Sequence, residues 1–339
     1  MNTYRVVQVG CGAMAHKWVD IANERPDLEM IGLVDLNHAT AEKCAESHKL
    51  PLSIVFDTLE EALSKAKPDI VFDITIPSAH YDVTLKALAA GCHVFGEKPM
   101  ADTMDRAREM VTAAKASGKI YAVMQNRRYL PYQRSLRAFL ESGGIGDIST
   151  VNADFYIGAH FGGFRDLMES PLVLDMAIHT FDQARQISGA DPVAVYCHEH
   201  NPKGSWYRGN ASATCIFEMT DGIVFNYRGS WCSEGLITSW ESEWRVQGSK
   251  GSAKWDGVNN LEAEVISVAE GFMRKHESVE IPEIAMPLTG HDGCVDAMMT
   301  ALHEGHDPET VCMENIKSLA MVHSAIESAR TKERVEISI

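Results

Sequence analysis

The sequence lacks the features that mark a membrane, secreted or nucleic-acid-binding protein. No apolar run approaches the length of a membrane span, and the N-terminus enters a strand pattern directly, without a basic and apolar leader. Acidic residues outnumber basic ones, giving a formal net charge of −16 at pH 7. This charge argues against nucleic acid or an anionic membrane as partner, so we expect a cytoplasmic protein that binds neither.

CxxC pairs, internal repeats and low-complexity tracts are also missing. The eight cysteines are scattered and most lie inside apolar runs, which indicates reduced core residues of a cytosolic protein. A hydrophobic content of 45% with 23% charged residues is typical of a soluble globular protein. A chain of 339 residues is too long for one ordinary core, so two domains are expected.

The first third of the chain alternates short β-rich runs with stretches of helical spacing. The runs are YRVVQVG, MIGLVD, DIVFDITI, HVFGEKP and IYAVMQN. Several are apolar throughout, as expected for parallel strands that are covered on both faces. The alternation predicts an α/β fold in which residues 1–125 form a doubly wound parallel sheet, a Rossmann domain.

The remainder of the chain, residues 126–339, carries a different pattern. In GIVFNYRGSW, apolar and polar residues alternate, and the preceding Asp221-Gly222 is a strong hairpin signal. We expect a second, α+β domain for substrate binding and oligomerisation, with a large mainly antiparallel sheet. Two helices are expected to close the chain, near His291–His303 and Glu314–Thr331.

A glycine motif joins the first predicted strand to the first predicted helix. VVQVGCGAMAHKW places Gly10, Gly12 and Ala15 as G-x-G-x-x-A, which permits a tight turn and a close approach to a pyrophosphate at the helix N-terminus. Asp35 ends the second strand, at about the position where an acid accepts the ribose hydroxyls. Asp35 would repel a 2′-phosphate and no arginine follows it directly, so the sequence favours NAD over NADP as cofactor.

Polar groups follow two further strands. Glu97-Lys98-Pro99 closes the fifth strand, and His80 follows the fourth, so both should face the cofactor crevice at the carboxyl ends of the parallel strands. Asp175 and His179 are four residues apart, so on a helix both project from one face. Oxidation of a secondary alcohol needs a base for the hydroxyl proton, and either a histidine or a desolvated lysine can serve.

These motifs, taken in order, resemble the Gfo/Idh/MocA family of sugar and polyol dehydrogenases. The resemblance is carried by G-x-G-x-x-A, Asp35, I-P-S-A-H, E-K-P and the D-x-x-x-H of LVLDMAIHTFDQAR, and it extends to WRVQGSKGSAKW. One departure is Ser170-Pro171-Leu172, where many members carry a glycine run.

The resemblance implies an NAD-dependent dehydrogenase that oxidises a secondary hydroxyl of a sugar or cyclitol, and a homodimer or homotetramer that pairs through the sheet. It implies catalytic roles for Lys98, Asp175 and His179, with His179 favoured as base. The cofactor-binding residues would be Gly10, Gly12, Ala13, Met14, Ala15, Asp35, Ile76, Pro77, His80, Glu97, Lys98 and Asn126. The substrate would contact Lys98, Arg127, Tyr129, His160, Arg165, Asp175 and His179.

The substrate itself stays open at this point. Trp206, Trp231 and Trp240 are candidates for an aromatic platform under a sugar ring, or for core positions. The pair Arg127-Arg128 could instead read a carboxylate, which leaves a neutral polyol and an acidic sugar as alternatives.

The sequence also bears on a metal site and on two alternative functions. His198-Glu199-His200 has no evident third ligand nearby, so no metal is expected. An NAD-dependent glycosidase would oxidise its substrate transiently, with no net redox change. A non-catalytic sensor with this fold would be expected to lose the lysine and the histidine, and both are present.

Overall fold

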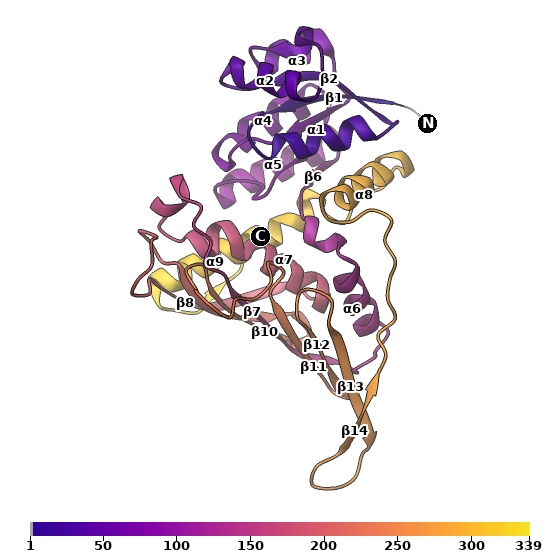
Figure 1. Ribbon diagram of the computed structural model, residues 1–339, viewed down its shortest axis with the longest axis vertical. Helices are drawn as coiled ribbons and strands as arrows, with labels where there is room; N and C mark the ends of the chain where they lie inside the picture. Colours follow the sequence, from indigo (N-terminus) through magenta and orange to yellow (C-terminus); the bar gives the residue numbers. More distant parts are fainter. Residues whose placement is uncertain (1–2) are drawn as a thin grey trace. The chain divides into compact units, whose positions relative to one another are not determined.

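The computed structural model describes residues 3–339, which divide into two compact units (Figure 1). The nucleotide unit comprises residues 3–124 and His291–Ile316, and the second unit comprises Gln125–Gly290 and Lys317–Ile339. The sequence prediction assigned all of 126–339 to the second domain. The structure differs, because His291–Ile316 packs with the nucleotide unit.

The nucleotide unit is built on a six-stranded sheet of order β3-β2-β1-β4-β5-β6, and all neighbouring strands run parallel. The strand order reverses direction between β1 and β4, which places a ligand crevice beyond the carboxyl ends of these two strands. The doubly wound prediction is confirmed. The strands are β1 (Tyr4–Val9), β2 (Leu28–Val34), β3 (Val55–Phe56), β4 (Ile70–Asp73), β5 (His93–Gly96) and β6 (Tyr121–Val123).

Helices pack around this sheet and connect its strands (Figure 1). Local signals fix several of their ends. The side chains of Thr58 and Thr103 accept hydrogen bonds from backbone N–H groups of the first helical turn, and Gly118 ends a helix in the left-handed conformation. The helices are α1 (Ala15–Glu24), α2 (His38–Ser47), α3 (Leu59–Ala66), α4 (Pro77–Ala89) and α5 (Met104–Ser117).

Helix α8 (Gly290–Glu304) returns to the nucleotide unit and is attached there by ion pairs. Lys17 lies 2.7 Å from Asp292, and Arg25 lies 2.7 Å from Asp296. Because both cations come from or just after α1, charge complementarity across two helices fixes the segment. The hydrophobic spacing of the sequence gives no indication of such ion pairs.

The second unit is built on a nine-stranded sheet of order β14-β13-β12-β11-β7-β10-β9-β8-β15. Strands β10 and β7 run parallel and the other neighbouring pairs run antiparallel, which confirms a mainly antiparallel sheet. The strands are β7 (Ile148–Tyr156), β8 (Pro192–His200), β9 (Ser212–Met219), β10 (Val224–Ser230), β11 (Glu243–Gly248), β12 (Gly251–Trp255), β13 (Leu261–Val268), β14 (Lys275–Val279) and β15 (Val335–Glu336).

One face of this sheet is covered by helices α6 (Pro131–Glu141), α7 (Ala177–Ser188) and the part of α9 (Cys312–Thr331) that begins at Lys317. Phe181 of α7 packs edge-on against Phe217 and Tyr227, with ring centroids 4.8 and 5.2 Å apart. The predicted hairpin joins β9 to β10, and Asp221 and Gly222 both adopt positive φ, as such turns require. The alternation in the sequence therefore identified the buried face.

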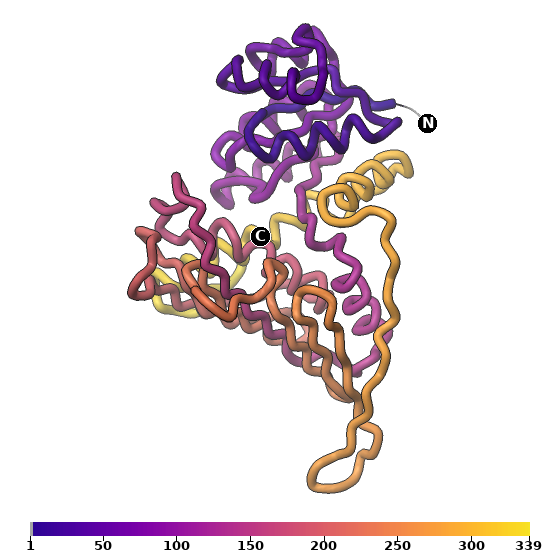
Figure 2. Tube along the Cα trace, viewed as in Figure 1, coloured from indigo at the N-terminus to yellow at the C-terminus, as the bar shows by residue number. Residues whose placement is uncertain are grey.

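Figure 2 shows two extended segments in the second unit. The hairpin between β13 and β14 extends past the end of the sheet, and residues 280–289 run without helix or strand. Among residues 3–339, every helix is too short or too polar to cross a lipid bilayer.

Candidate active site

The glycine turn after β1 has the geometry that a dinucleotide site needs. Gly10 has φ +93°, and a Cβ at this position would lie 2.4 Å from the carbonyl oxygen of Ile74, so only glycine fits. At Gly12 a Cβ would meet no described atom within 4 Å, so this glycine leaves room for a ligand. The N-cap residue of α1, Met14, makes no side-chain capping hydrogen bond, which leaves the helix N-terminus available to an anion.

Asp35 is held by the main chain at the end of β2. Its Oδ2 accepts a hydrogen bond of 2.9 Å from the backbone N–H of Cys11, and its Oδ1 accepts one of 2.9 Å from that of Asn37. The carboxylate is therefore fixed beside the glycine turn before any ligand arrives.

A cavity of about 450 Å³ opens beside this carboxylate, a volume within the range of small-molecule sites. Two large apolar side chains of its lining are exposed to water, Leu36 by 107% and Ile76 by 64%. Such side chains offer apolar surface to the flat faces of a ligand. The cavity is lined by Val9, Gly10, Gly12, Val34, Asp35, Leu36, Asp57, Thr58, Leu59, Glu60, Ile74, Thr75, Ile76, Ala79, Asp82, Val83 and Lys86.

The polar lining of the cavity is mainly acidic. Its lysine, Lys86, lies 2.5 Å from the carboxylate of Glu60. The neighbouring His38 has its Nδ1 2.7 Å from Asp57. Both basic groups are thus already engaged by carboxylates, which bears on the choice between the two nicotinamide cofactors.

Glu97 and Lys98 lie at the carboxyl end of β5, half-buried. Trp18 donates its indole N–H to Glu97 Oε1 at 2.9 Å, and the backbone N–H of Lys98 donates to Glu97 Oε2 at 3.2 Å. The Lys98–Pro99 peptide bond is cis. Glu97 therefore anchors the backbone from which the Lys98 side chain projects.

His80, expected at the cofactor, lies in the interior of the unit. The residue is 1% exposed, its Nδ1 is 2.9 Å from Asp73 Oδ1, and it is not among the described residues that line the cavity. Thr75 donates its hydroxyl to the same Asp73 oxygen at 2.6 Å. This arrangement fixes the start of α4, whose first residue is Pro77.

In the second unit, Asp175 lies in a π-helical turn, Leu172–Met176, and His179 lies in the first turn of the α-helix that follows. The sequence predicted a helix here, and the π turn is an irregularity that its spacing did not indicate. Such turns are frequent at functional sites. It begins just after Pro171, within the stretch that departs from the family pattern.

Asp175 accepts a hydrogen bond from the side chain of an arginine. Arg165 Nε donates to Asp175 Oδ2 at 2.6 Å, and the two side chains are 32% and 15% exposed. The guanidinium also lies over the rings of Phe161 and Phe164, at 5.2 and 4.7 Å. A planar cation stacked in this way keeps its direction, and so fixes that of the carboxylate.

The three candidate platform tryptophans lie in different surroundings. Trp231 is 1% exposed and belongs to the core, whereas Trp240 is 44% exposed. Trp206 stacks on His160, with ring centroids 3.6 Å apart, and His160 also lies 3.1 Å from Glu234. Trp206 and His160 thus form an aromatic pair at the surface.

The residues after β6 are largely buried in the second unit. Arg128 forms a two-pronged ion pair with Asp182, at 2.6 and 2.8 Å. Arg127 lies 3.0 Å from Glu241. Burial raises the pKa of the Glu241 carboxyl, and the charge of Arg127 opposes that rise.

Tyr129, expected at the substrate, is 4% exposed and packs against the guanidinium of Arg134 at 4.9 Å. Asn126 begins the short 3₁₀ turn Asn126–Tyr129 and is half-buried.

Glu199 is a perturbed acid that the sequence presented as the middle residue of His198-Glu199-His200, with no sign of its burial. Burial raises its pKa to about 7, although its Oε2 accepts a hydrogen bond of 3.0 Å from Ser170. Its neighbours His198 and His200 are exposed and stack on each other at 5.8 Å. Strand alternation thus separates the acid from the histidines, and its contact with Ser170 connects it to the residues just before the Leu172–Met176 turn.

Comparison with known proteins supports both units. Residues 4–125 match the family described as "Oxidoreductase family, NAD-binding Rossmann fold", and residues 133–254 match the one described as "GFO/IDH/MocA C-terminal domain". Together the two matches span well over half of the chain.

Similar proteins include sugar and cyclitol dehydrogenases. The chain is 31% identical to D-glucoside 3-dehydrogenase of Escherichia coli over 208 residues, 59% of each chain. It is 22% identical to inositol 2-dehydrogenase of Rhizobium meliloti, over 99% of this chain and 100% of that one. A solved oxidoreductase from Agrobacterium radiobacter, in complex with NAD⁺, L-tartaric acid and magnesium, has a TM-score of 0.86 at 18% identity, with 99% of each chain covered. The structural likeness shows the fold alone.

Proposed function

Because the chain belongs to the Gfo/Idh/MocA family of NAD(P)-dependent oxidoreductases, we propose that it oxidises a secondary hydroxyl of a sugar, a glycoside or a cyclitol. The observation that carries the proposal is that the chain has a preformed nucleotide cavity in one unit and, in the other, an Asp175 that is hydrogen-bonded to Arg165 and lies just before His179. The first suits a dinucleotide, and the second suits a hydroxylated substrate.

We propose NAD rather than NADP as the cofactor. Asp35 is fixed beside the cavity by two backbone N–H groups, and Asp57, Glu60 and Asp82 add further negative charge to the lining. A 2′-phosphate would meet these carboxylates, while Lys86 is engaged by Glu60. Ribose hydroxyls, by contrast, can donate hydrogen bonds to Asp35.

The residues present can divide the reaction between them. The nicotinamide ring would accept the hydride. Asp175, held by Arg165, accepts a hydrogen bond from a substrate hydroxyl and so orients the substrate. His179 takes the proton from the reacting hydroxyl, and the ammonium of Lys98 stabilises the developing negative charge on that oxygen.

The substrate class follows from the surface of the second unit and from the relatives. The stacked pair of His160 and Trp206 offers a ring face of the kind that packs under a sugar. Arg127 and Arg128 are each engaged by a buried or half-buried carboxylate, which favours a neutral substrate over an acidic sugar. The similarity to D-glucoside 3-dehydrogenase makes glucosides the first compounds to try.

The test is NADH formation by purified protein with NAD and a panel of sugars, aryl glycosides and cyclitols, with aglycone release followed in parallel. NADH produced in proportion to one substrate, and abolished by His179→Ala, supports the dehydrogenase. Aglycone released without NADH would identify an NAD-dependent glycosidase instead. Neither product with any compound would overturn the proposal.

The proposal includes the cytoplasmic location and a homodimer or homotetramer. The β8–β9 part of the large sheet exposes Tyr196 by 47% and Ile216 by 45%, and these residues pair across the two strands. Such apolar positions on an open sheet face suit a second copy of the chain. A monomeric mass in light scattering would contradict this part, and Ile216→Lys should weaken an assembly that uses this face.

A further inference from the structure

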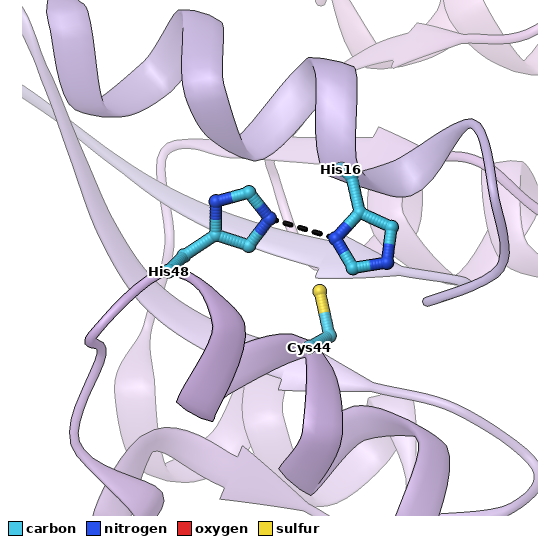
Figure 3. Close-up of side chains that lie close together, drawn as sticks. All are labelled: His16, Cys44 and His48. Atoms are coloured by element: carbon cyan, nitrogen blue, oxygen red, sulfur yellow. Dashed lines mark hydrogen bonds between the residues drawn. The ribbon is translucent and has the colours of Figure 1, made fainter.

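Two neighbouring helices of the nucleotide unit bring together three potential metal ligands (Figure 3). His16 belongs to α1, Cys44 belongs to α2, and His48 directly follows α2. One ligand atom from each lies within 4.8 Å of the other two, and His16 Nδ1 is 2.8 Å from His48 Nε2. Figure 3 shows both rings and the thiol directed toward a common point.

The distance between the two imidazole nitrogens is close to that in a tetrahedral zinc site. With Zn–N of about 2.05 Å and Zn–S of about 2.3 Å, two nitrogen ligands lie about 3.3 Å apart, and nitrogen and sulfur lie about 3.6 Å apart. On binding zinc, the distance between the two imidazole nitrogens would therefore increase by about half an ångström. Small rotations of two half-buried side chains can provide this, with no movement of the helices.

A carboxylate beside the cluster selects the histidine tautomer that a metal requires. Asp20 Oδ1 lies 3.0 Å from His48 Nδ1. Since a carboxylate accepts, His48 carries a proton on Nδ1, and in the neutral ring Nε2 then presents a lone pair toward His16. A histidine ligand oriented by a carboxylate on its other nitrogen is a recurring feature of zinc sites.

We propose that His16, Cys44 and His48 bind one Zn²⁺ ion per chain. The ligand set of two imidazoles and one thiolate suits this borderline-soft cation. A water completes the tetrahedron. None of these residues belongs to the group to which we assign the redox chemistry.

The position of the site gives the ion a structural consequence. It would join α1, whose N-terminus faces the proposed pyrophosphate position, to α2, which follows Asp35. Cys44 and His48 are four residues apart and share one helix face, but His16 comes from another helix, so only the fold brings all three ligands together. A ligand that binds only the folded state raises thermal stability, so zinc should stabilise the nucleotide unit whether or not NAD is bound.

The test uses the full-length chain without an affinity tag, stripped of metal and titrated with Zn²⁺ against a chromophoric chelator. We expect one Zn²⁺ per chain and a rise in the melting temperature on zinc addition. Cys44→Ala and His48→Asn should each weaken binding at least 100-fold. Asp20→Asn changes a half-exposed carboxylate and should weaken binding by roughly 10- to 100-fold.

Two variants serve as matched controls. His38 also lies in α2, but its imidazole pairs with Asp57, so His38→Asn should leave zinc binding unchanged. Cys92 is a buried thiol that donates to the carbonyl oxygen of Pro68, so Cys92→Ala should do the same. Co²⁺ substitution should add a thiolate-to-cobalt charge-transfer band that Cys44→Ala removes and His38→Asn retains.

Two results would overturn the proposal. One is a stoichiometry far below one Zn²⁺ per chain in the wild type. The other is unchanged affinity in both Cys44→Ala and His48→Asn. Circular dichroism of each variant shows whether weaker binding results from misfolding. Asp20→Asn gives a second check, because its side chain lies at the surface and its replacement should leave the fold intact.

Discussion

Two aspartates, one in each unit, are held in different ways. In the nucleotide unit, Asp35 accepts hydrogen bonds from the backbone N–H groups of Cys11 and Asn37. In the second unit, Asp175 accepts a hydrogen bond from the side chain of Arg165. A main-chain donor is as fixed as the turn that carries it, whereas a side-chain donor can be removed by a single substitution. We expect the first unit to bind NAD robustly and the second to be readily altered in its choice of substrate.

The largest expected effect separates binding from chemistry. Lys98→Ala should lower kcat by roughly 10² to 10⁴, because in the proposed mechanism its ammonium stabilises the negative charge that develops on the reacting oxygen. The dissociation constant of NAD should change little, since the glycine turn and Asp35 are untouched. Steady-state kinetics together with NAD titration by fluorescence measures both quantities. Near-normal turnover in this variant would remove Lys98 from the mechanism.

The two glycines of the turn should respond in opposite ways to the same added methyl group. Gly10→Ala puts Cβ 2.4 Å from the carbonyl oxygen of Ile74 at a φ of +93°, so we expect a loss of about 3 kcal/mol in the free energy of unfolding. Gly12→Ala meets no described atom within 4 Å, so stability should be retained while NAD binding weakens. Urea unfolding and NAD titration of both variants provide the comparison. Equal stability in the two variants would contradict the close approach at Gly10.

The second unit should lose stability as pH rises. Burial raises the folded-state pKa of Glu199 from an ordinary value of 4.5 to about 7. Folding therefore favours the protonated acid, and its contribution is complete below about pH 4.5 and lost as pH rises through about 7, a change of about 3 kcal/mol. Glu199→Gln should melt at a higher temperature than the wild type at pH 8, with the difference vanishing near pH 4.5. A difference that is independent of pH would rule out this titration.

The nucleotide unit should show the opposite dependence. Burial lowers the folded-state pKa of His93 from 6.5 to about 4, and its Nδ1 accepts a hydrogen bond from the backbone N–H of Ile120. Folding favours the neutral ring, so its contribution is present above about pH 6.5 and lost as pH falls through about 4. After allowance for solvent screening we expect about 2 kcal/mol. His93→Gln should flatten the acid limb of the melting curve, and an unchanged acid limb would assign that loss to other groups.

The same contrast explains what the sequence could predict. The Rossmann sheet, the glycine turn and Asp35 depend on local patterns, namely apolar runs, turn residues and short spacings. The π turn around Asp175, the contact between Ser170 and Glu199, and the burial of His80 depend on side chains that meet only after folding. The His16, Cys44 and His48 cluster has the same origin, because two helices must pack before its ligands share a point.

The smallest expected effect tests the side-chain anchor of the second unit. Arg165→Lys keeps the charge but loses the Nε donor and the planar stack on Phe161 and Phe164, so the hydrogen bond that orients Asp175 should weaken. We expect KM for the sugar or cyclitol to rise about tenfold with kcat less affected, since orientation of a bound hydroxyl contributes to both ground and transition states. Arg228→Lys is the matched control, because Arg228 also forms an ion pair with an aspartate, Asp154, but is 61% exposed. If both lysine variants behave like the wild type, Asp175 does not depend on its arginine, and the proposed difference between main-chain and side-chain anchoring fails in the second unit.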